Sequence, residues 1–151
     1  MNNLAILCVD DQREVLSALK KDLDYFSDIC DIIECESAAE AEEVIREIRE
    51  SEQRLFLIIC DHIMPGENGV DLLARLDRES ALNGTKKILL TGLADQEDTI
   101  RAINEANVDR YIDKPWDGDT LIGEIKKLLA AFLRENSLGS ERSEEHTSEL
   151  Q

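Results

Sequence analysis

Three acidic side chains, a hydroxyl and an amine stand at the ends of apolar segments in this chain. Two of the acids, Asp10 and Asp11, follow one apolar run, and the third, Asp61, follows another. Thr91 ends a third apolar run, and Lys114 follows a fourth. Because the carboxyl ends of parallel strands meet at one edge of a sheet, we expect these side chains to lie close together.

This combination of groups is suited to a divalent cation and a phosphoryl group. Carboxylates about 4 Å apart repel each other by about 4 kcal/mol per pair at an effective dielectric near 20, so a cation must offset them. Donors that are all oxygen favour Mg²⁺. A cation can draw in a phosphoryl donor, and a carboxylate can then attack it and form an aspartyl phosphate. Asp61 is best placed for that attack, while Thr91 and Lys114 can hold the phosphoryl oxygens.

Apolar segments alternate with amphipathic segments along the chain, which predicts five β-α units. Ser37 and Glu40 form a capping box at the start of the second expected helix. Right-handed crossovers between apolar strands give a parallel sheet with helices on both faces, an α/β doubly wound fold. Strands are expected near 4–9, 30–35, 55–60, 86–91 and 108–112, and helices near 13–26, 38–50, 69–79, 96–105 and 118–134.

Length, composition and charge exclude several classes of protein. The 151 residues correspond to about one domain, and 42% hydrophobic residues is a globular value. The net charge of −17 argues against a surface that binds nucleic acid or an anionic membrane. No apolar run approaches the roughly 20 residues of a membrane span. No secretory signal precedes the first strand, so we expect a cytoplasmic location.

Other reactive side chains near the expected strands are interpreted as structural. His62 adjoins Asp61 and is expected to point to solvent rather than to a metal. The cysteines lack CxxC spacing and are expected to be small buried thiols rather than disulfides or zinc ligands. They are Cys8, Cys30, Cys35 and Cys60.

The C-terminal segment departs from the pattern of the rest of the chain. Residues 1–134 are expected to form the folded domain, and the polar stretch 135–141 is interpreted as a linker. Residues 142–151, RSEEHTSELQ, match the in-frame translation of a common sequencing adapter residue for residue. We interpret them as foreign, disordered sequence, which implies that the natural C-terminus and any output domain are missing. A natural acidic tail is the alternative interpretation.

Taken together, these segments resemble the receiver domains of two-component response regulators from about residue 4 to residue 133. The matching stretches are CVDD at 8–11, CDHIMPG at 60–66 with Gly69, LTG at 90–92 and YIDKP at 111–115. Each stretch alone is a weak signal, but their order and their positions after strands make the combination specific. The resemblance implies a flavodoxin-like (βα)5 sheet with strand order 2-1-3-4-5.

The resemblance also implies roles for the acidic residues. Asp61 would be the phosphoacceptor and would help to bind Mg²⁺. Asp11 would bind the ion directly, and Asp10 would do so largely through water. The backbone carbonyl of Ile63 would be a further ligand.

Roles in holding the phosphoryl group and in switching are implied for the later motifs. Thr91 and Lys114 would bind the phosphoryl oxygens. Tyr111 would be an aromatic switch that turns inward when Thr91 moves toward the phosphate. The peptide bond between Lys114 and Pro115 is expected to be cis, a minority form that is usually a placed structural feature.

The function expected from the resemblance is a phosphorylation-dependent signalling switch. A sensor histidine kinase or phosphotransfer protein would supply the phosphoryl group, and the added charge of about −2 would change the output surface. The domain would catalyse its own phosphorylation and dephosphorylation but is not otherwise expected to be an enzyme. Because Ile63 and Leu93 flank the expected path of attacking water and cannot orient it, slow loss of the phosphoryl group is expected.

Two other interpretations of the acidic residues remain open. A haloacid-dehalogenase-like phosphatase also forms an aspartyl phosphate, but that family places its nucleophile in an Asp-x-Asp motif on the first strand, and Gln12 breaks that motif here. A constitutive protein-interaction module, as in degenerate receivers, usually lacks an acid or the lysine, and none is lost here.

Overall fold

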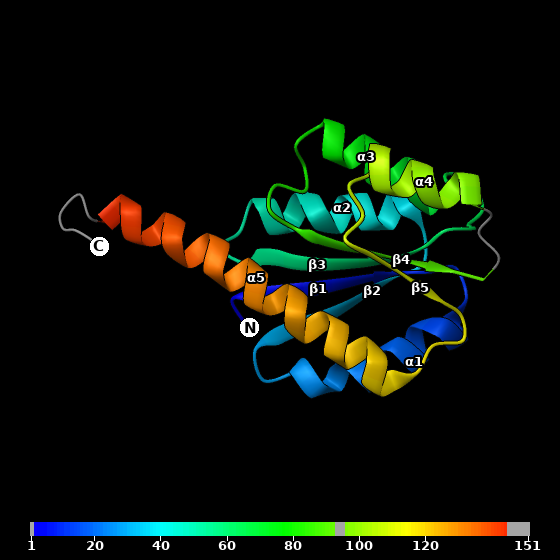
Figure 1. Cartoon of the computed structure of the whole chain (residues 1–151), viewed down its shortest axis with the longest axis horizontal. Coiled ribbons are helices and arrows are strands. Elements are labelled where there is room, and N and C mark those ends of the chain that lie inside the picture. The colour runs from blue at the N-terminus through cyan, green and yellow to red at the C-terminus, as the bar shows by residue number, and fades with distance from the viewer. Residues whose placement is uncertain (1, 93–95, 145–151) are drawn as a thin grey trace.

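The chain alternates strands and helices throughout the computed structural model, which describes residues 2–92 and 96–144 (Figure 1). Each strand and helix expected from the sequence has a counterpart. The strands are β1 (Leu4–Val9), β2 (Cys30–Cys35), β3 (Arg54–Asp61), β4 (Lys86–Thr91) and β5 (Arg110–Asp113). The helices are α1 (Arg13–Leu23), the short 3-10 helix η1 (Asp24–Phe26), α2 (Ala38–Arg49), α3 (Gly69–Arg78), α4 (Gln96–Glu105) and α5 (Gly118–Glu144).

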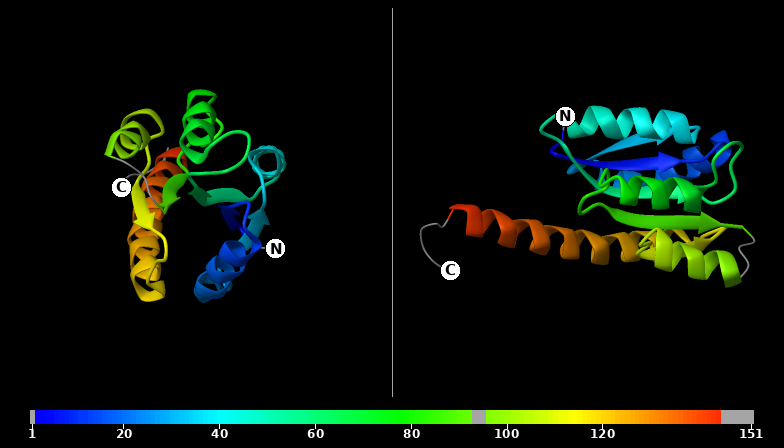
Figure 2. Two further views of the ribbon diagram at one scale, coloured as in Figure 1. Left: turned by 90° about the vertical axis from the view of Figure 1, so that its right-hand side faces the viewer. Right: turned by 90° about the horizontal axis from the view of Figure 1, so that it is seen from above.

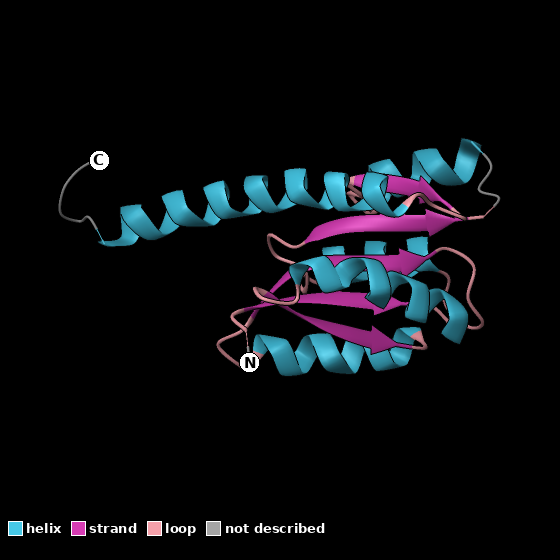
Figure 3. Cartoon of the chain, turned by 90° about the horizontal axis from the view of Figure 1, so that it is seen from below, coloured by secondary structure: helices cyan, strands magenta, loops and turns pink. Residues whose placement is uncertain are grey.

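The strands form one parallel sheet in the order β2-β1-β3-β4-β5, which confirms the predicted doubly wound fold. The central strand β3 pairs with β1 on one side and with β4 on the other. The register places Val9 beside Cys60, and Asp61 beside Leu90. All strands point the same way, so their carboxyl ends share one edge of the sheet (Figure 3).

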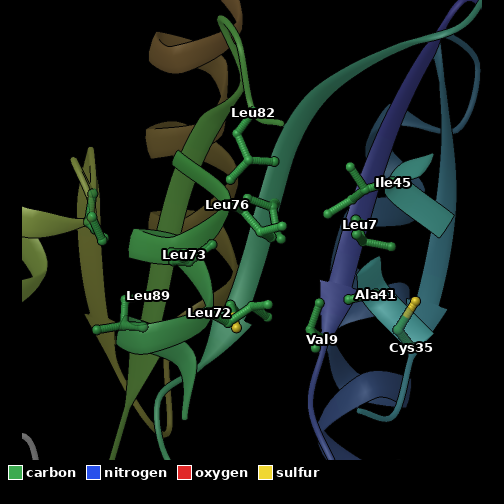
Figure 4. Packing of buried hydrophobic residues seen from close by; sticks show 14 of the residues in the cluster. Leu7, Val9, Cys35, Ala41, Ile45, Leu72, Leu73, Leu76, Leu82 and Leu89 are labelled. Atoms are coloured by element: carbon green, nitrogen blue, oxygen red, sulfur yellow. The ribbon is translucent and has the colours of Figure 1, made fainter. Parts of the chain in front are cut away.

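Helices cover both faces of the sheet, as strands that are apolar on both sides require. Helices α1 and α5 lie on one face, and α2, α3 and α4 lie on the other (Figure 2). Side chains alternate between the faces along β1. Leu7 and Val9 belong to the core under α2 and α3, part of which Figure 4 shows, while Ile6 belongs to the core under α1 and α5. In that second core the ring centroids of Phe56 and Phe132 lie 5.3 Å apart, and this contact joins β3 to α5.

Side-chain caps fix the starts of two helices. The Ser37 hydroxyl accepts a hydrogen bond from the backbone N–H of Glu40 at 3.1 Å, as the capping box predicts. The Glu40 carboxylate reaches back to the N–H of Glu36 at 2.7 Å, one residue before the cap. Asn68 caps α3 in the same way and accepts from the N–H of Asp71 at 2.8 Å. This second cap matters for function, because α3 begins directly after the loop that follows Asp61.

The ends of two elements differ from the sequence prediction. Helix α5 continues past residue 134 to Glu144, so the backbone expected to be a linker is helical (Figure 1). This stretch contains no proline, and a single glycine costs a helix only about 1 kcal/mol. Strand β5 begins at Arg110 rather than at residue 108, because the chain turns at Asn107 with φ +53 and the N–H of Val108 bonds to the carbonyl of Ala102 at 3.3 Å. Residues 142–144, which were expected to be disordered, belong to α5, and the interpretation of residues 142–151 as foreign sequence stays a prediction.

The four cysteines are buried free thiols, as predicted. Burial raises the pKa of Cys30 to about 11 and that of Cys35 to about 12. Burial also raises the pKa values of Cys8 and Cys60. Within the described residues, no helix is long and apolar enough to cross a membrane.

Candidate functional site

Three acidic side chains converge at the carboxyl edge of the sheet. Asp10 and Asp11 follow β1, and Asp61 ends the neighbouring strand β3. One carboxylate oxygen from each of the three lies within 4.8 Å of the other two. The proximity that we expected from their positions after the strands is therefore confirmed.

The three acids differ in exposure and in hydrogen bonding. Asp10 is 0% exposed and Asp61 is 5% exposed, whereas Asp11 is exposed. Both oxygens of Asp10 are engaged, because Oδ1 accepts the N–H of Gln12 at 2.8 Å and Oδ2 lies 3.1 Å from the Nζ of Lys114. The carboxylate of Asp11 therefore remains the more accessible of the two to an ion arriving from solvent.

Lys114 lies between the two buried acids. Its Nζ is 2.7 Å from the Oδ1 of Asp61 and 3.1 Å from the Oδ2 of Asp10. The backbone N–H of Lys114 donates to the carbonyl of Thr91 at 2.8 Å, so pairing of β4 with β5 carries the lysine to this edge. The peptide bond from Lys114 to Pro115 is cis, as expected.

Burial and neighbouring charges shift the pKa values of this cluster. Burial is the main cause of the raised pKa of Asp61; the hydrogen bond from Lys114 opposes it, and the charges of Asp10 and Asp11 add to it. Burial lowers the pKa of Lys114, but its hydrogen bonds to Asp61 and Asp10 outweigh this effect and leave the pKa raised. Three acids beside one ammonium form a site that favours a further cation.

A cavity of about 680 Å³ opens above the cluster and is lined in part by Asp11, Asp61, Ile63 and Lys114. The side chain of Ile63 is 68% exposed at this opening. An open cavity of this size, with convergent polar groups at its base, has room for a phosphoryl group and for the donor that carries it.

Thr91 and Tyr111 lie on the two neighbouring strands β4 and β5. Thr91 ends β4 at the edge that carries the acids and is 3% exposed. The register places Tyr111 beside Leu89, two residues before the level of Thr91. The Tyr111 side chain is 51% exposed, so the ring faces outward in this structure. The switch role of Tyr111 stays a prediction.

The loop between β3 and α3 packs closely against the end of β3. The N–H of Gly69 donates to the carbonyl of His62 at 2.7 Å. A Cβ atom at Gly69 would lie 2.1 Å from the carbonyl oxygen of Asp61, a distance that no side chain tolerates. Gly66, with φ +84, supplies the turn earlier in the same loop. Glycine at position 69 is therefore required by the close approach of two backbone segments.

The expectation that His62 points to solvent was wrong, since this residue is 3% exposed. The N–H of His62 donates to the carbonyl of Leu90 at 2.9 Å, so pairing of β3 with β4 continues one residue past the end of the strand. The side chain of His62 is therefore buried next to the end of β3 rather than directed to solvent.

Sequence reasoning missed the polar contacts that hold the surroundings of the site. Arg75 of α3 bonds to Glu67 in the loop after β3 and to Glu42 in α2. The indole N–H of Trp116 donates to a carboxylate oxygen of Asp22 at 2.7 Å and joins the loop after β5 to α1. The spacing between the partners in the chain carries no signal for either contact, because each depends on how distant elements pack.

Comparison with known sequences identifies the family. The sequence model of the response regulator receiver domain matches residues 6–126. The hydrogenase transcriptional regulatory protein HoxA from Cupriavidus necator is 32% identical over 126 residues, which cover 83% of this chain and 24% of HoxA. The phosphate regulon transcriptional regulatory protein PhoB from Escherichia coli is 33% identical over 73 residues, which cover 48% of this chain and 31% of PhoB. The chain thus spans about a quarter of the length of HoxA.

Solved structures give the same result. The signal receiver domain of an HD domain-containing protein from Pseudomonas fluorescens Pf-5 has a TM-score of 0.78 and 28% identity, with 91% of this chain and 94% of that chain covered. A CheY-like response regulator receiver domain from Methanospirillum hungatei JF-1 has a TM-score of 0.75 and 27% identity, with 87% and 97% covered. This chain therefore belongs to the family of response regulator receiver domains of two-component systems.

Proposed function

We propose that this receiver domain is a phosphorylation-dependent signalling switch in which Asp61 accepts a phosphoryl group with the help of Mg²⁺. One observation carries the proposal. The carboxylates of Asp10, Asp11 and Asp61 lie within 4.8 Å of one another, with the Lys114 ammonium 2.7 Å from Asp61. This arrangement supplies a nucleophile, a cation site and a partner for phosphoryl oxygens in one place.

The donor set fits Mg²⁺, which prefers oxygen ligands and usually keeps several waters. Asp11 and Asp61 would hold the ion directly, together with the backbone carbonyl of Ile63. Asp10 would act largely through water, because its two oxygens are already engaged by Gln12 and Lys114. When bound, Mg²⁺ supplies positive charge that offsets the charge of the phosphoryl oxygens and polarises them.

The transfer step assigns a task to each of the remaining side chains. A carboxylate oxygen of Asp61 attacks the phosphorus of a phosphohistidine; the new O–P bond forms as the N–P bond breaks, and the imidazole nitrogen keeps the electron pair and takes up a proton. Lys114 opposes the effect of burial on the pKa of Asp61 and so favours the ionised form that acts as the nucleophile. After transfer, Lys114 and the Thr91 hydroxyl bind two phosphoryl oxygens.

The partners follow from this chemistry. A sensor histidine kinase or a phosphotransfer protein would deliver the phosphoryl group in the cytoplasm. Tyr111, now 51% exposed, would turn inward as Thr91 moves toward the phosphate and change the surface near β4 and β5. HoxA and PhoB are named as transcriptional regulatory proteins, and this chain covers 24% and 31% of them. We therefore also propose that a separate output domain carries the response.

Incubation with acetyl phosphate and Mg²⁺ tests the proposed function. Mass spectrometry of the intact protein is expected to find a gain of one phosphoryl group that is stable in acid and labile in base. Chelation of Mg²⁺ with EDTA should prevent the gain. The Asp61→Asn variant, which keeps the size of the side chain but lacks the nucleophilic oxygen, should acquire none. An equal gain in this variant would exclude Asp61 as the acceptor.

Replacing Ile63 should shorten the lifetime of the phosphorylated state. Ile63 is 68% exposed at the cavity and cannot orient a water molecule; Leu93, the other residue expected on the water path, lies outside the described residues. Ile63→Asn and Ile63→Glu are each expected to speed dephosphorylation several-fold by supplying a polar group that positions water. Loss of the phosphoryl mass over time measures the rate. Ile29→Glu, at an exposed isoleucine before β2, serves as the control, and an unchanged rate in both Ile63 variants would refute the idea.

A further inference from the structure

Arg75 of α3 binds two carboxylates from different parts of the chain. Its Nε and Nη2 atoms lie 3.0 and 2.9 Å from the two carboxylate oxygens of Glu67. Its Nη1 and Nη2 atoms lie 3.2 and 3.0 Å from the two oxygens of Glu42. Glu67 belongs to the loop after β3 and Glu42 to α2. One guanidinium therefore joins the loop to two helices.

The geometry of these contacts differs from that of ordinary surface ion pairs, most of which contribute little. Both pairs are bidentate, the form in which an arginine and a carboxylate bind most strongly and with the most defined orientation. The side chains of Arg75, Glu67 and Glu42 are only 29%, 28% and 34% exposed. Hydrogen bonds to the two acids raise the pKa of Arg75, and the bond from Arg75 lowers the pKa of Glu42.

The loop that Arg75 holds is the one that carries groups of the proposed Mg²⁺ site. It begins after Asp61 and includes Ile63, and it closes at Gly69, whose N–H bonds to the carbonyl of His62 at 2.7 Å. Glu67 lies two residues before Gly69, where a Cβ atom would lie 2.1 Å from the carbonyl oxygen of Asp61, so this part of the loop is close to the end of β3. A change in how Glu67 is held is therefore a change in the loop beside the acids.

We propose that Arg75 is a positioning residue for Mg²⁺ binding. By holding Glu67 against α2 and α3, it fixes the loop 62–68 in the conformation that presents the carbonyl of Ile63 to the ion. The inference rests on the proposed function of the site. It differs from a purely structural ion pair, which would alter thermal stability and leave the affinity for Mg²⁺ unchanged.

Two variants break the contact, and the first of them does so without a change of charge. Arg75→Lys keeps the positive charge but cannot bind two carboxylates in a bidentate manner. Glu67→Gln removes the loop end of the contact with little change in shape. Calorimetric titration with Mg²⁺ is expected to give a Kd about tenfold weaker for each variant, the lower end of the range for residues that orient metal ligands. The double variant should bind Mg²⁺ with the same affinity as the single variant that binds it less tightly, because both changes break the same contact.

Arg110→Lys provides the matched control. Arg110 also binds a glutamate, since its Nε lies 2.7 Å from Glu124, but that glutamate belongs to α5 and not to the loop after β3. Its Kd for Mg²⁺ should equal that of the wild type. A wild-type Kd in Arg75→Lys, with only the melting temperature lowered, would overturn the positioning role and leave the proposed function intact. A wild-type protein that binds no Mg²⁺ at all would overturn both. Circular dichroism establishes that each variant is folded before titration.

Discussion

Replacing Lys114 by methionine is expected to lower the free energy of unfolding of the metal-free protein by about 3 kcal/mol, as when one partner of a buried ion pair is removed. The Lys114 ammonium lies 2.7 Å from Asp61 and 3.1 Å from Asp10, which are 5% and 0% exposed. Without it, two buried carboxylates lose their countercharge, while methionine retains most of the apolar stem. Urea denaturation in EDTA at neutral pH measures the loss.

The loss should depend on pH in a defined direction. Burial raises the pKa of Asp61 above its ordinary value of 3.8, so the folded protein binds a proton there more readily than the unfolded chain does. Below pH 3.8, Asp61 is protonated in both states and its burial costs no charge. As the pH rises through the folded-state pKa, the carboxylate becomes charged and the free energy of unfolding falls. The difference between Lys114→Met and wild type should be smaller in acidic than in neutral buffer.

Added Mg²⁺ should restore more stability to Lys114→Met than to the wild type, because the ammonium no longer competes for Asp61. Lys127→Met is the matched control: the Lys127 side chain is 70% exposed and its Nζ lies 3.6 Å from Glu124. Its effect should stay within about 0.5 kcal/mol. Equal denaturation midpoints for Lys114→Met and wild type in EDTA would contradict the role given to this ammonium.

Replacing Gly69 by alanine is expected to abolish phosphorylation and to cost about 3 kcal/mol of stability, the upper end of the usual range for overpacking. The added Cβ would lie 2.1 Å from the carbonyl oxygen of Asp61 and 3.1 Å from the Cα of His62. Both are backbone atoms, so no side-chain rotation can relieve the clash, and we expect the strand end that carries the acceptor to be displaced. Chemical denaturation and the acetyl phosphate assay measure the two effects.

Gly123→Ala in α5 is the control for Gly69→Ala. Beyond the adjacent residues and the backbone of α5 itself, no heavy atom lies within 4 Å of a Cβ built at Gly123. Alanine in the middle of this helix should therefore raise the stability by about 1 kcal/mol and leave phosphorylation unchanged. Phosphorylation of Gly69→Ala at the wild-type rate would mean that the loop can move away without displacing Asp61.

The fold could be predicted because its signals are local. The apolar runs that became β1, β3 and β4 are long enough to mark buried strands, and the acids that follow them could be placed at one edge from topology alone. The end of α5 could not be predicted, because the polar stretch after residue 134 contains nothing that forces a helix to stop. The burial of His62 was missed because it depends on one extra backbone bond, to Leu90.

The candidate site could be predicted only in part. The residues of the cluster could be predicted from the strand ends. The different roles in Mg²⁺ binding that were expected for Asp10 and Asp11 came from the family resemblance. The hydrogen bonds of Gln12 and Lys114 to the oxygens of Asp10 support this difference, which stays a proposal. The contacts of Arg75 could not be foreseen, because its partners lie 8 and 33 residues away in the chain and meet it only when the loop after β3 and α2 pack beside α3.

The burial of the native thiols determines how the protein can be labelled. At neutral pH almost none of Cys30 or Cys35, with pKa values raised to about 11 and about 12, is thiolate, which is the form that reacts with maleimides. A cysteine introduced at an exposed position, such as Ala130 in α5, would react selectively while the core cysteines stay in place. Fluorescent or spin probes could then follow this helix in the otherwise native protein.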